Sequence, residues 1–184
     1  MNAQRPFFVV LAAGMLISAE ANAQAIAVSP DVAPTTERLA SWTPFIEEAS
    51  LRFDSSRAWI EGVIIAQSGG RTMLNGRPIT SRAGAMGLMQ LMPATYADMR
   101  LSLGLGSDPY DPHDNILAGT AYLRAMYDRF GYPGLFGAYN AGPGRYAASL
   151  QGVRLPLETR IYLARLTKNG ASLRSGTAIF VGQK

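Results

Sequence analysis

Several side chains in the middle of this chain could do chemistry, and Gln67 is the most informative of them. It ends a stripe formed by Ile60, Val63 and Ile64, at the i, i+3, i+4 and i+7 spacing of one helical face. A carboxyl group at this position would lose water on its apolar side, and its pKa would rise toward the range that a general acid needs. An amide does not titrate, so Gln67 could bind a ligand but could not transfer a proton.

Two further segments could hold a polar ligand. Tyr139 and Asn140 place an aromatic face and an amide at the end of an expected helix, a pair suited to stacking on a sugar ring and bonding its hydroxyls. Residues 84–90 combine small residues with methionines and end in Gln90, so that the backbone could come close to a ligand beside one amide. Taken alone, each segment is also explained by core packing.

Acidic and metal-binding groups are scarce around Gln67. No Asp or Glu lies between Glu61 and Asp98. At roughly 100° per helical residue, Glu61 points away from the face of Gln67 and is a poor substitute for an acid there. His113 is the only histidine, and the chain has 0 cysteines. We therefore predict that His113 is a solvent-facing loop residue, and we expect no metal site and no cofactor.

Helical periodicity dominates the chain. The sequence predicts an N-cap at Thr43 with Pro44 as the first helical residue. It also predicts a long helix that is capped by Asp114-Asn115 and ends at Gly131. Further helices are predicted over residues 57–68, 134–140, 144–150 and 157–167.

Strand-like alternation is limited to residues 72–80, where Asn75-Gly76 is a strong signal for a hairpin turn. The fold class predicted from these patterns is mainly α, with one small hairpin. We expect four regions along the chain: a signal peptide (1–23), a flexible lead-in (24–42), a single domain (43–168) and a C-terminal tail (169–184).

The N-terminal residues resemble a secretory signal, because Arg5 precedes a short apolar run and Ala21-Asn22-Ala23 is a small-residue cleavage site. We expect an exported protein of the bacterial periplasm or cell envelope without stable membrane insertion after cleavage; an N-terminal membrane anchor is the alternative. Without cysteine, lipoprotein anchoring is excluded. The net charge of +4, with 15 of 17 basic residues Arg, suits either an anionic polymer or simple solubility. No basic run is interleaved with aromatics, so we expect no nucleic-acid partner.

Four ordered segments resemble the soluble lytic transglycosylase (SLT) family of the lysozyme-like superfamily: Ile64–Gly70, Ser81–Pro93, Ala138–Pro143 and Leu155–Tyr162. That family has Glu where this chain has Gln67. The resemblance implies a lysozyme-like single domain, with glycan strands of peptidoglycan as the ligand. The stretch between Gln67 and Ser81 departs from the family, because it is longer than the family's usual spacing, and we expect its hairpin to lie at the rim of the cleft.

The resemblance also implies a mechanism with a single acid at position 67. That acid protonates the β-1,4 linkage between N-acetylmuramic acid (MurNAc) and N-acetylglucosamine (GlcNAc), then deprotonates the C6 hydroxyl of muramic acid to close a 1,6-anhydro ring. With Gln67 in place, we expect the chain to be inactive or strongly impaired. The hydroxyl of Tyr139 is expected close to position 67. The substrate-binding residues that the resemblance implies are Ser68, Ser81, Met89, Gln90, Met92, Tyr139, Asn140, Glu158 and Tyr162.

Two alternatives stay open from the sequence. One is a non-catalytic protein that binds peptidoglycan and assembles with an envelope-spanning secretion, conjugation or flagellar apparatus. The other is a hydrolytic lysozyme-like enzyme, which would need a second carboxylate facing position 67, such as Glu158 or Asp98. Glu158 is equally explained as the acidic residue in the first turn of its helix. Three origins of Gln67 also stay open: an introduced substitution, a naturally inactive relative and a misread codon.

Overall fold

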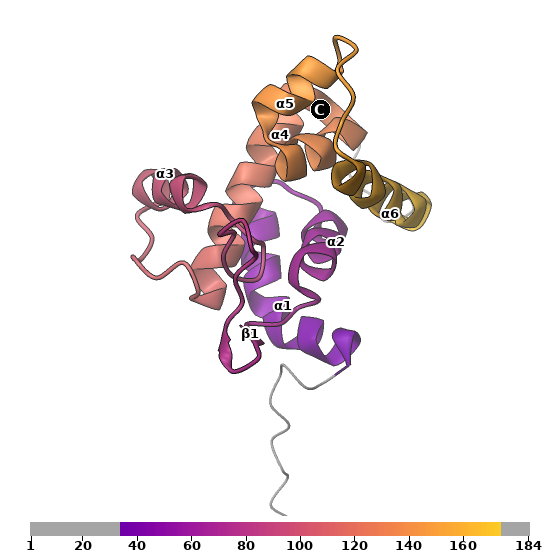
Figure 1. The fold of residues 1–184 in the computed structure, drawn as a ribbon. Coiled ribbons are helices and arrows are strands. Elements are labelled where there is room, and N and C mark those ends of the chain that lie inside the picture. The colour runs from indigo at the N-terminus through magenta and orange to yellow at the C-terminus, as the bar shows by residue number, and fades with distance from the viewer. Residues whose placement is uncertain (1–33, 174–184) are drawn as a thin grey trace, which may run out of the picture.

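The computed structural model describes residues 34–173, with side chains up to residue 168, and the fold is built around one long helix. The elements in chain order are α1 (Thr35–Arg52), α2 (Arg57–Ser68), β1 (Met73–Leu74), β2 (Arg77–Pro78), α3 (Pro93–Leu103), α4 (Pro112–Ala141), α5 (Pro143–Ser149) and α6 (Leu157–Leu173). Helix α4 contacts α1, α3, α5 and α6, and α2 packs against α1 and α6. In Figure 1, α3 lies on one side of α4, and α2 and α6 lie on the other. None of the helices in the described range is long and apolar enough to cross a membrane.

The long helix begins earlier than the sequence analysis predicted. Its N-cap is Asp111, whose side chain accepts a hydrogen bond from the backbone N–H of Asp114, and Pro112 occupies the first turn. The expected cap at Asp114-Asn115 is therefore wrong, because an Asp directly before Pro supplies both the cap and the preset φ of the first turn. The predicted end at Gly131 is confirmed as a break: Gly131 and the next residue have non-helical torsions, and the helix resumes after them.

The first helix contradicts the expected lead-in and cap. Helix α1 begins at Thr35, and Pro44 lies inside it, so residues 35–42 are helical and Thr43 is not an N-cap. Arg38 and Trp42 are buried on the face that continues into the apolar stripe of this helix. An arginine within that stripe hides the helical period, which is why the sequence analysis placed the start too late. The predicted signal peptide and the lead-in up to residue 33 lie outside the described residues.

The hairpin is confirmed. Asn75 and Gly76 have φ values of 52° and 74°, which suits the left-handed turn that joins two short antiparallel strands. Met73 pairs with Pro78 and Leu74 with Arg77.

Helix α3 was not predicted at all, and helix α6 ends later than predicted. Pro93 starts α3, Gly104 ends it in the left-handed conformation, and Tyr96 is its one buried residue. A single buried position gives no readable apolar stripe. Helix α6 continues to Leu173, so residues 169–173 of the expected tail are helical. Residues 174–184 lie outside the described residues.

Candidate active site

A cavity of about 660 Å³ lies where the end of α2 meets the loop of residues 81–92 and the end of the long helix. Seven of the residues that the sequence analysis named as site candidates line it. These are Gln67, Ser81, Gln90, Met92, Tyr139, Asn140 and Glu158. Tyr122, Thr95 and Arg145 also line it and were not predicted.

A second cavity of about 420 Å³ adjoins the first on the side of α6. Gln67, Asn140 and Glu158 line both cavities, and the second adds Tyr162 and Arg165. Gln67 therefore stands at the junction of two recesses, where a ligand occupying either one comes within reach of its amide.

A third, larger cavity of about 730 Å³ lies beside the hairpin. Its lining includes Asn75, Arg77 and Tyr110, and the Tyr110 hydroxyl is 2.9 Å from the Thr80 hydroxyl. None of the predicted site residues lines it, so its size does not make it the site.

The position of Gln67 is fixed by the end of α2. Gly69 terminates that helix in the left-handed conformation, and Gly70 follows with φ of 75°. The carbonyls of these glycines accept hydrogen bonds from α1, at 2.6 Å from Arg38 Nε and at 2.9 Å from Trp42 Nε1. The turn directly after Gln67 is thus bonded to a neighbouring helix, and these α1 residues were missed because they were placed in a flexible lead-in.

Two predicted residues are turned away from both cavities. Ser68 is buried, and its hydroxyl donates to the Ile64 carbonyl and accepts the Gly70 N–H, each at 3.1 Å. Met89 is fully buried, and its sulfur packs against Gly119. We therefore correct the expectation that these two side chains contact the ligand: Ser68 closes the end of α2, and Met89 belongs to the core.

The loop of residues 81–92 is held by hydrogen bonds from its own residues and from α4. The Ser81 hydroxyl accepts the Ala85 N–H at 3.0 Å. Gln90, at φ of 51°, donates from Nε2 to the Gly87 carbonyl at 2.8 Å. Buried Asn115 accepts the Met89 N–H at 2.8 Å and donates to the Met86 carbonyl at 3.1 Å. Asn115 therefore attaches the loop to α4, a role that no spacing in the sequence indicates.

Tyr139 supports the loop rather than position 67. Its hydroxyl donates to the Met89 carbonyl at 2.8 Å, and its ring lies 5.3 Å from that of Tyr122 at 53°. Burial raises the pKa of Tyr139 well above its ordinary value, with smaller contributions from Tyr162 and Tyr122. The hydroxyl expected beside position 67 is thus engaged elsewhere and stays protonated, although the side chain lines the larger cavity.

Tyr162 is the tyrosine whose hydroxyl lies next to Gln67. Burial raises the pKa of Tyr162, and interaction with the Gln67 side chain lowers it by less. The hydroxyl nevertheless has no well-formed hydrogen bond to any residue that the structure describes. The hydroxyl oxygen itself is buried, while the Tyr162 side chain lines the smaller cavity.

Of the acidic residues considered for the site, only one brings a carboxylate to it. Glu158 lines both cavities with Gln67, whereas Asp98 lines neither. The Glu61 side chain is 37% exposed and pairs at 3.8 Å with Arg57, as expected for a residue on another face of α2. The described cavity linings therefore bring no acid other than Glu158 to Gln67.

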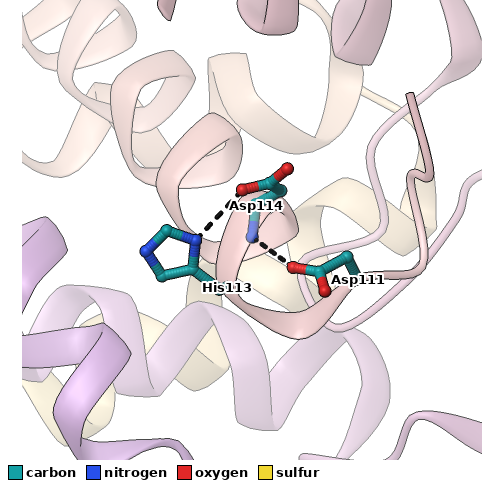
Figure 2. Close-up of side chains that lie close together, drawn as sticks. All are labelled: Asp111, His113 and Asp114. Carbon is teal, nitrogen blue, oxygen red and sulfur yellow. Dashed lines mark hydrogen bonds and ion pairs between the residues drawn. The ribbon is translucent and has the colours of Figure 1, made fainter. Parts of the chain in front are cut away.

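A separate cluster of Asp111, His113 and Asp114 sits at the start of α4 (Figure 2). His113 is not the loop residue that we expected: it lies in the first helical turn, with Nδ1 at 3.0 Å from Asp114 and Nε2 at 3.0 Å from Glu48 of α1. The carboxylate of Asp111 caps the helix, and Asp114 Oδ2 accepts the Gly106 N–H at 2.7 Å. Each group already has a protein partner, so the cluster is explained as a joint between helices.

Comparison with known proteins places these features in a family. The sequence profile of the Transglycosylase SLT domain matches residues 44–154. A transglycosylase of Enterobacteria phage PRD1 is 43% identical over 90 residues, which cover 49% of this chain and 30% of the phage protein. The soluble lytic murein transglycosylase of Escherichia coli K12 is 46% identical over 74 residues, which cover 36% of this chain and 12% of that protein.

Solved structures share the fold. The 70 kDa soluble lytic transglycosylase of Escherichia coli matches with a TM-score of 0.61 and 27% identity over 74% of this chain and 24% of that one. An inactive glutamate-to-glutamine mutant of the lytic transglycosylase Slt from Pseudomonas aeruginosa matches with a TM-score of 0.58 and 26% identity, covering 72% of this chain and 24% of that one. The predicted mainly α, lysozyme-like fold is confirmed by these neighbours.

Proposed function

We propose a function in peptidoglycan cleavage or binding, since this chain belongs to the Transglycosylase SLT domain family. The chain spans less than a third of the first curated relatives it matches, so the proposal rests on the cleft. The observation that carries it is the place of Gln67, at the junction of two cavities lined by residues of the family's motifs. The glycan strand would lie along these cavities, with the bond to be broken beside position 67.

The reaction that fits this cleft needs one acid/base at position 67 and no water. A carboxylic acid there would protonate the oxygen between MurNAc and GlcNAc. As a carboxylate it would then take the proton of the muramic C6 hydroxyl, whose oxygen bonds to C1 and forms the 1,6-anhydro ring. Gln67 can do neither. Loss of general acid catalysis costs about 10²–10⁴ in rate, so the chain as written is inactive or strongly impaired.

Two observations support this view of Gln67. An amide keeps the shape and hydrogen-bonding groups of a carboxylic acid but cannot titrate, so the cleft keeps its form while losing the proton donor. One solved neighbour is an inactive mutant with the same type of replacement. The cleft of this chain would therefore hold glycan without cutting it.

The amide side chain of Gln67 also supports a second candidate function, which is binding without cleavage. A chain that binds glycan and does not cleave it could serve an envelope-spanning machine as a peptidoglycan-binding or assembly protein. Export to the periplasm or cell envelope, directed by residues 1–23, fits both candidates. A hydrolytic enzyme is supported less, because it would need Glu158 to act as the second carboxylate on a water beside position 67.

The experiment compares the chain with Gln67→Glu on purified sacculi. Soluble muropeptides are measured by mass spectrometry, and the sacculus-bound protein is measured by sedimentation. We expect both proteins to bind and only the variant to release products. Glu61→Gln made in the variant is the matched control, and it should stay active because Glu61 lies on another face of α2. Binding by both proteins without release by either would favour the assembly role.

A further inference from the structure

The largest of the three cavities described above lies beside the hairpin, and we call it the hairpin recess. It has a volume of about 730 Å³ and is lined by Leu74, Asn75, Arg77, Pro78, Thr80 and Tyr110. It shares no lining residue with the two cavities at Gln67. The hairpin lies at the end of the molecule opposite α5 and α6 (Figure 1). The hairpin recess is therefore a site of its own and not a part of either cavity at Gln67.

The hairpin that forms one wall of the recess is held at its base. The Ile79 side chain is buried, and its carbonyl accepts the Gly87 N–H at 3.1 Å. The Thr80 hydroxyl lies 2.9 Å from the Tyr110 hydroxyl, which joins the hairpin to the loop before α4. The four strand residues of the hairpin are all exposed. Because a two-stranded hairpin is only marginally stable alone, these contacts at its base preform the recess.

The hairpin recess carries a positive charge. The stretch from residue 62 to residue 97 has three arginines and no acidic residue. The Arg77 side chain lines the recess and forms no ion pair with any residue that the structure describes. Asp108 and Asp111, on either side of Tyr110, do not line the recess, and each accepts a backbone N–H. The guanidinium of Arg77 is therefore available to a carboxylate, with which arginine forms strong charge-assisted hydrogen bonds.

Apolar side chains complete the lining and favour a peptide over a sugar. Leu74 is 48% exposed and lies opposite Arg77 in the register of the hairpin. Pro78 lines the recess beside them. An extended peptide carries acidic and apolar side chains on neighbouring residues, so it can contact the guanidinium and the apolar lining together. A neutral sugar has no charge to offer to Arg77.

We propose that the hairpin recess docks an extended acidic segment of a partner protein. Arg77 bonds to a carboxylate of that segment, and Leu74 and Pro78 pack against its apolar side chains. Because the recess shares no residue with the cavities at Gln67, the chain can hold glycan and the partner at the same time. This docking goes beyond the proposed function and does not depend on whether position 67 cleaves the strand.

The test uses a phage-displayed library of random dodecapeptides as the probe. Phages that bind the Arg77→Gln, Leu74→Ser double variant are removed first, and the rest are selected on the unchanged chain and sequenced. We expect the selected peptides to be enriched in Asp and Glu next to apolar residues. One of them is then synthesised, and its dissociation constant is measured by fluorescence anisotropy. Arg77→Gln alone should weaken its binding about five- to tenfold, as the loss of one charge-assisted hydrogen bond allows.

Arg82→Gln is the matched control, because Arg82 is exposed, close to Arg77 in the sequence and outside the linings of all three cavities. It should leave peptide binding unchanged, and circular dichroism should show that every variant keeps the helical fold. An equal effect of Arg82→Gln and Arg77→Gln would mean long-range attraction and would overturn the proposal. A selection that yields no acidic peptides would also overturn it.

Sedimentation with purified sacculi separates a partner protein from the cell wall as the source of the acidic segment. We expect Arg77→Gln to bind sacculi as the unchanged chain does, and we expect the selected peptide not to release the chain from sacculi. Weaker sacculus binding by Arg77→Gln, or release by the peptide, would show that the wall itself occupies the recess and that the partner assignment is wrong. Failure of the unchanged chain to bind sacculi would contradict the proposed function, whereas the docking is judged by the peptide measurements.

Discussion

The hydrogen bonds from α1 to the end of α2 allow us to predict how much Arg38 contributes to the free energy of unfolding. Its Nε donates to the Gly69 carbonyl at 2.6 Å, and the side chain is 7% exposed. Arg38→Met keeps most of the aliphatic stem and removes the donor. A hydrogen bond from a charged group contributes about 1.5–3 kcal/mol, and an unpaired buried carbonyl costs about as much. Because relief of a buried charge offsets part of the loss, we expect the free energy of unfolding to fall by about 2 kcal/mol.

Urea unfolding followed by circular dichroism gives this number, provided that the slope of free energy against denaturant is unchanged. Trp42→Phe, which removes the donor to the Gly70 carbonyl, should cost about 1–2 kcal/mol. Arg154→Met is the matched control, because Arg154 is exposed and should change stability by less than about 0.5 kcal/mol. If Arg38→Met costs no more than that control, the bonds from α1 do not hold the turn after Gln67.

Three further perturbations follow from the fold. Gly87→Ala should cost at least about 2 kcal/mol in thermal or urea unfolding, because φ is 74° and a Cβ would collide with the Asn115 side chain; a neutral result would refute the packing. Tyr139→Phe should cost about 1–3 kcal/mol by leaving the Met89 carbonyl unpaired, and a stable variant would show that the bond is dispensable. Desolvation lowers the pKa of His113, but hydrogen bonds to two carboxylates outweigh it and raise that pKa overall. The chain should therefore exceed His113→Gln in free energy of unfolding by the full contribution of protonated His113 below a pH of about 6.5, and this difference should be lost as pH rises through the raised pKa. A stability difference that does not change with pH would contradict the two hydrogen bonds.

The sequence predicted the parts of the site that follow a local period. The stripe that ends in Gln67 identified α2, and the structure brings that residue into the cleft. The Asn75-Gly76 pair predicted the hairpin, because few other residues adopt its torsions. Local backbone preference and helical spacing were enough in both cases.

The other parts of the site depend on contacts between residues that are far apart in the sequence. The spacing of residues within one helix gives no sign of such contacts. Arg38 is buried and donates a hydrogen bond to the carbonyl of Gly69, directly after α2. Its charge within the buried stripe made the start of α1 look like a flexible lead-in. Ser68 and Met89 lie within motif segments, yet their side chains turn into the protein. Ser68 follows Gln67 on α2, where successive side chains point about 100° apart, so membership of a motif does not place a side chain in the cleft. Asn115 is buried by a loop more than twenty residues earlier in the chain, and its role appears only when that loop is in place.

The central claim is that one acid/base at position 67 would cleave the strand without water. The most direct measurement digests sacculi with the Gln67→Glu variant in ¹⁸O-labelled water and determines the masses of the products. We predict 1,6-anhydro muropeptides that carry no label at the new end, because the C6 oxygen and not water bonds to C1. Labelled reducing ends would contradict this claim and would indicate that Glu158 directs a water instead.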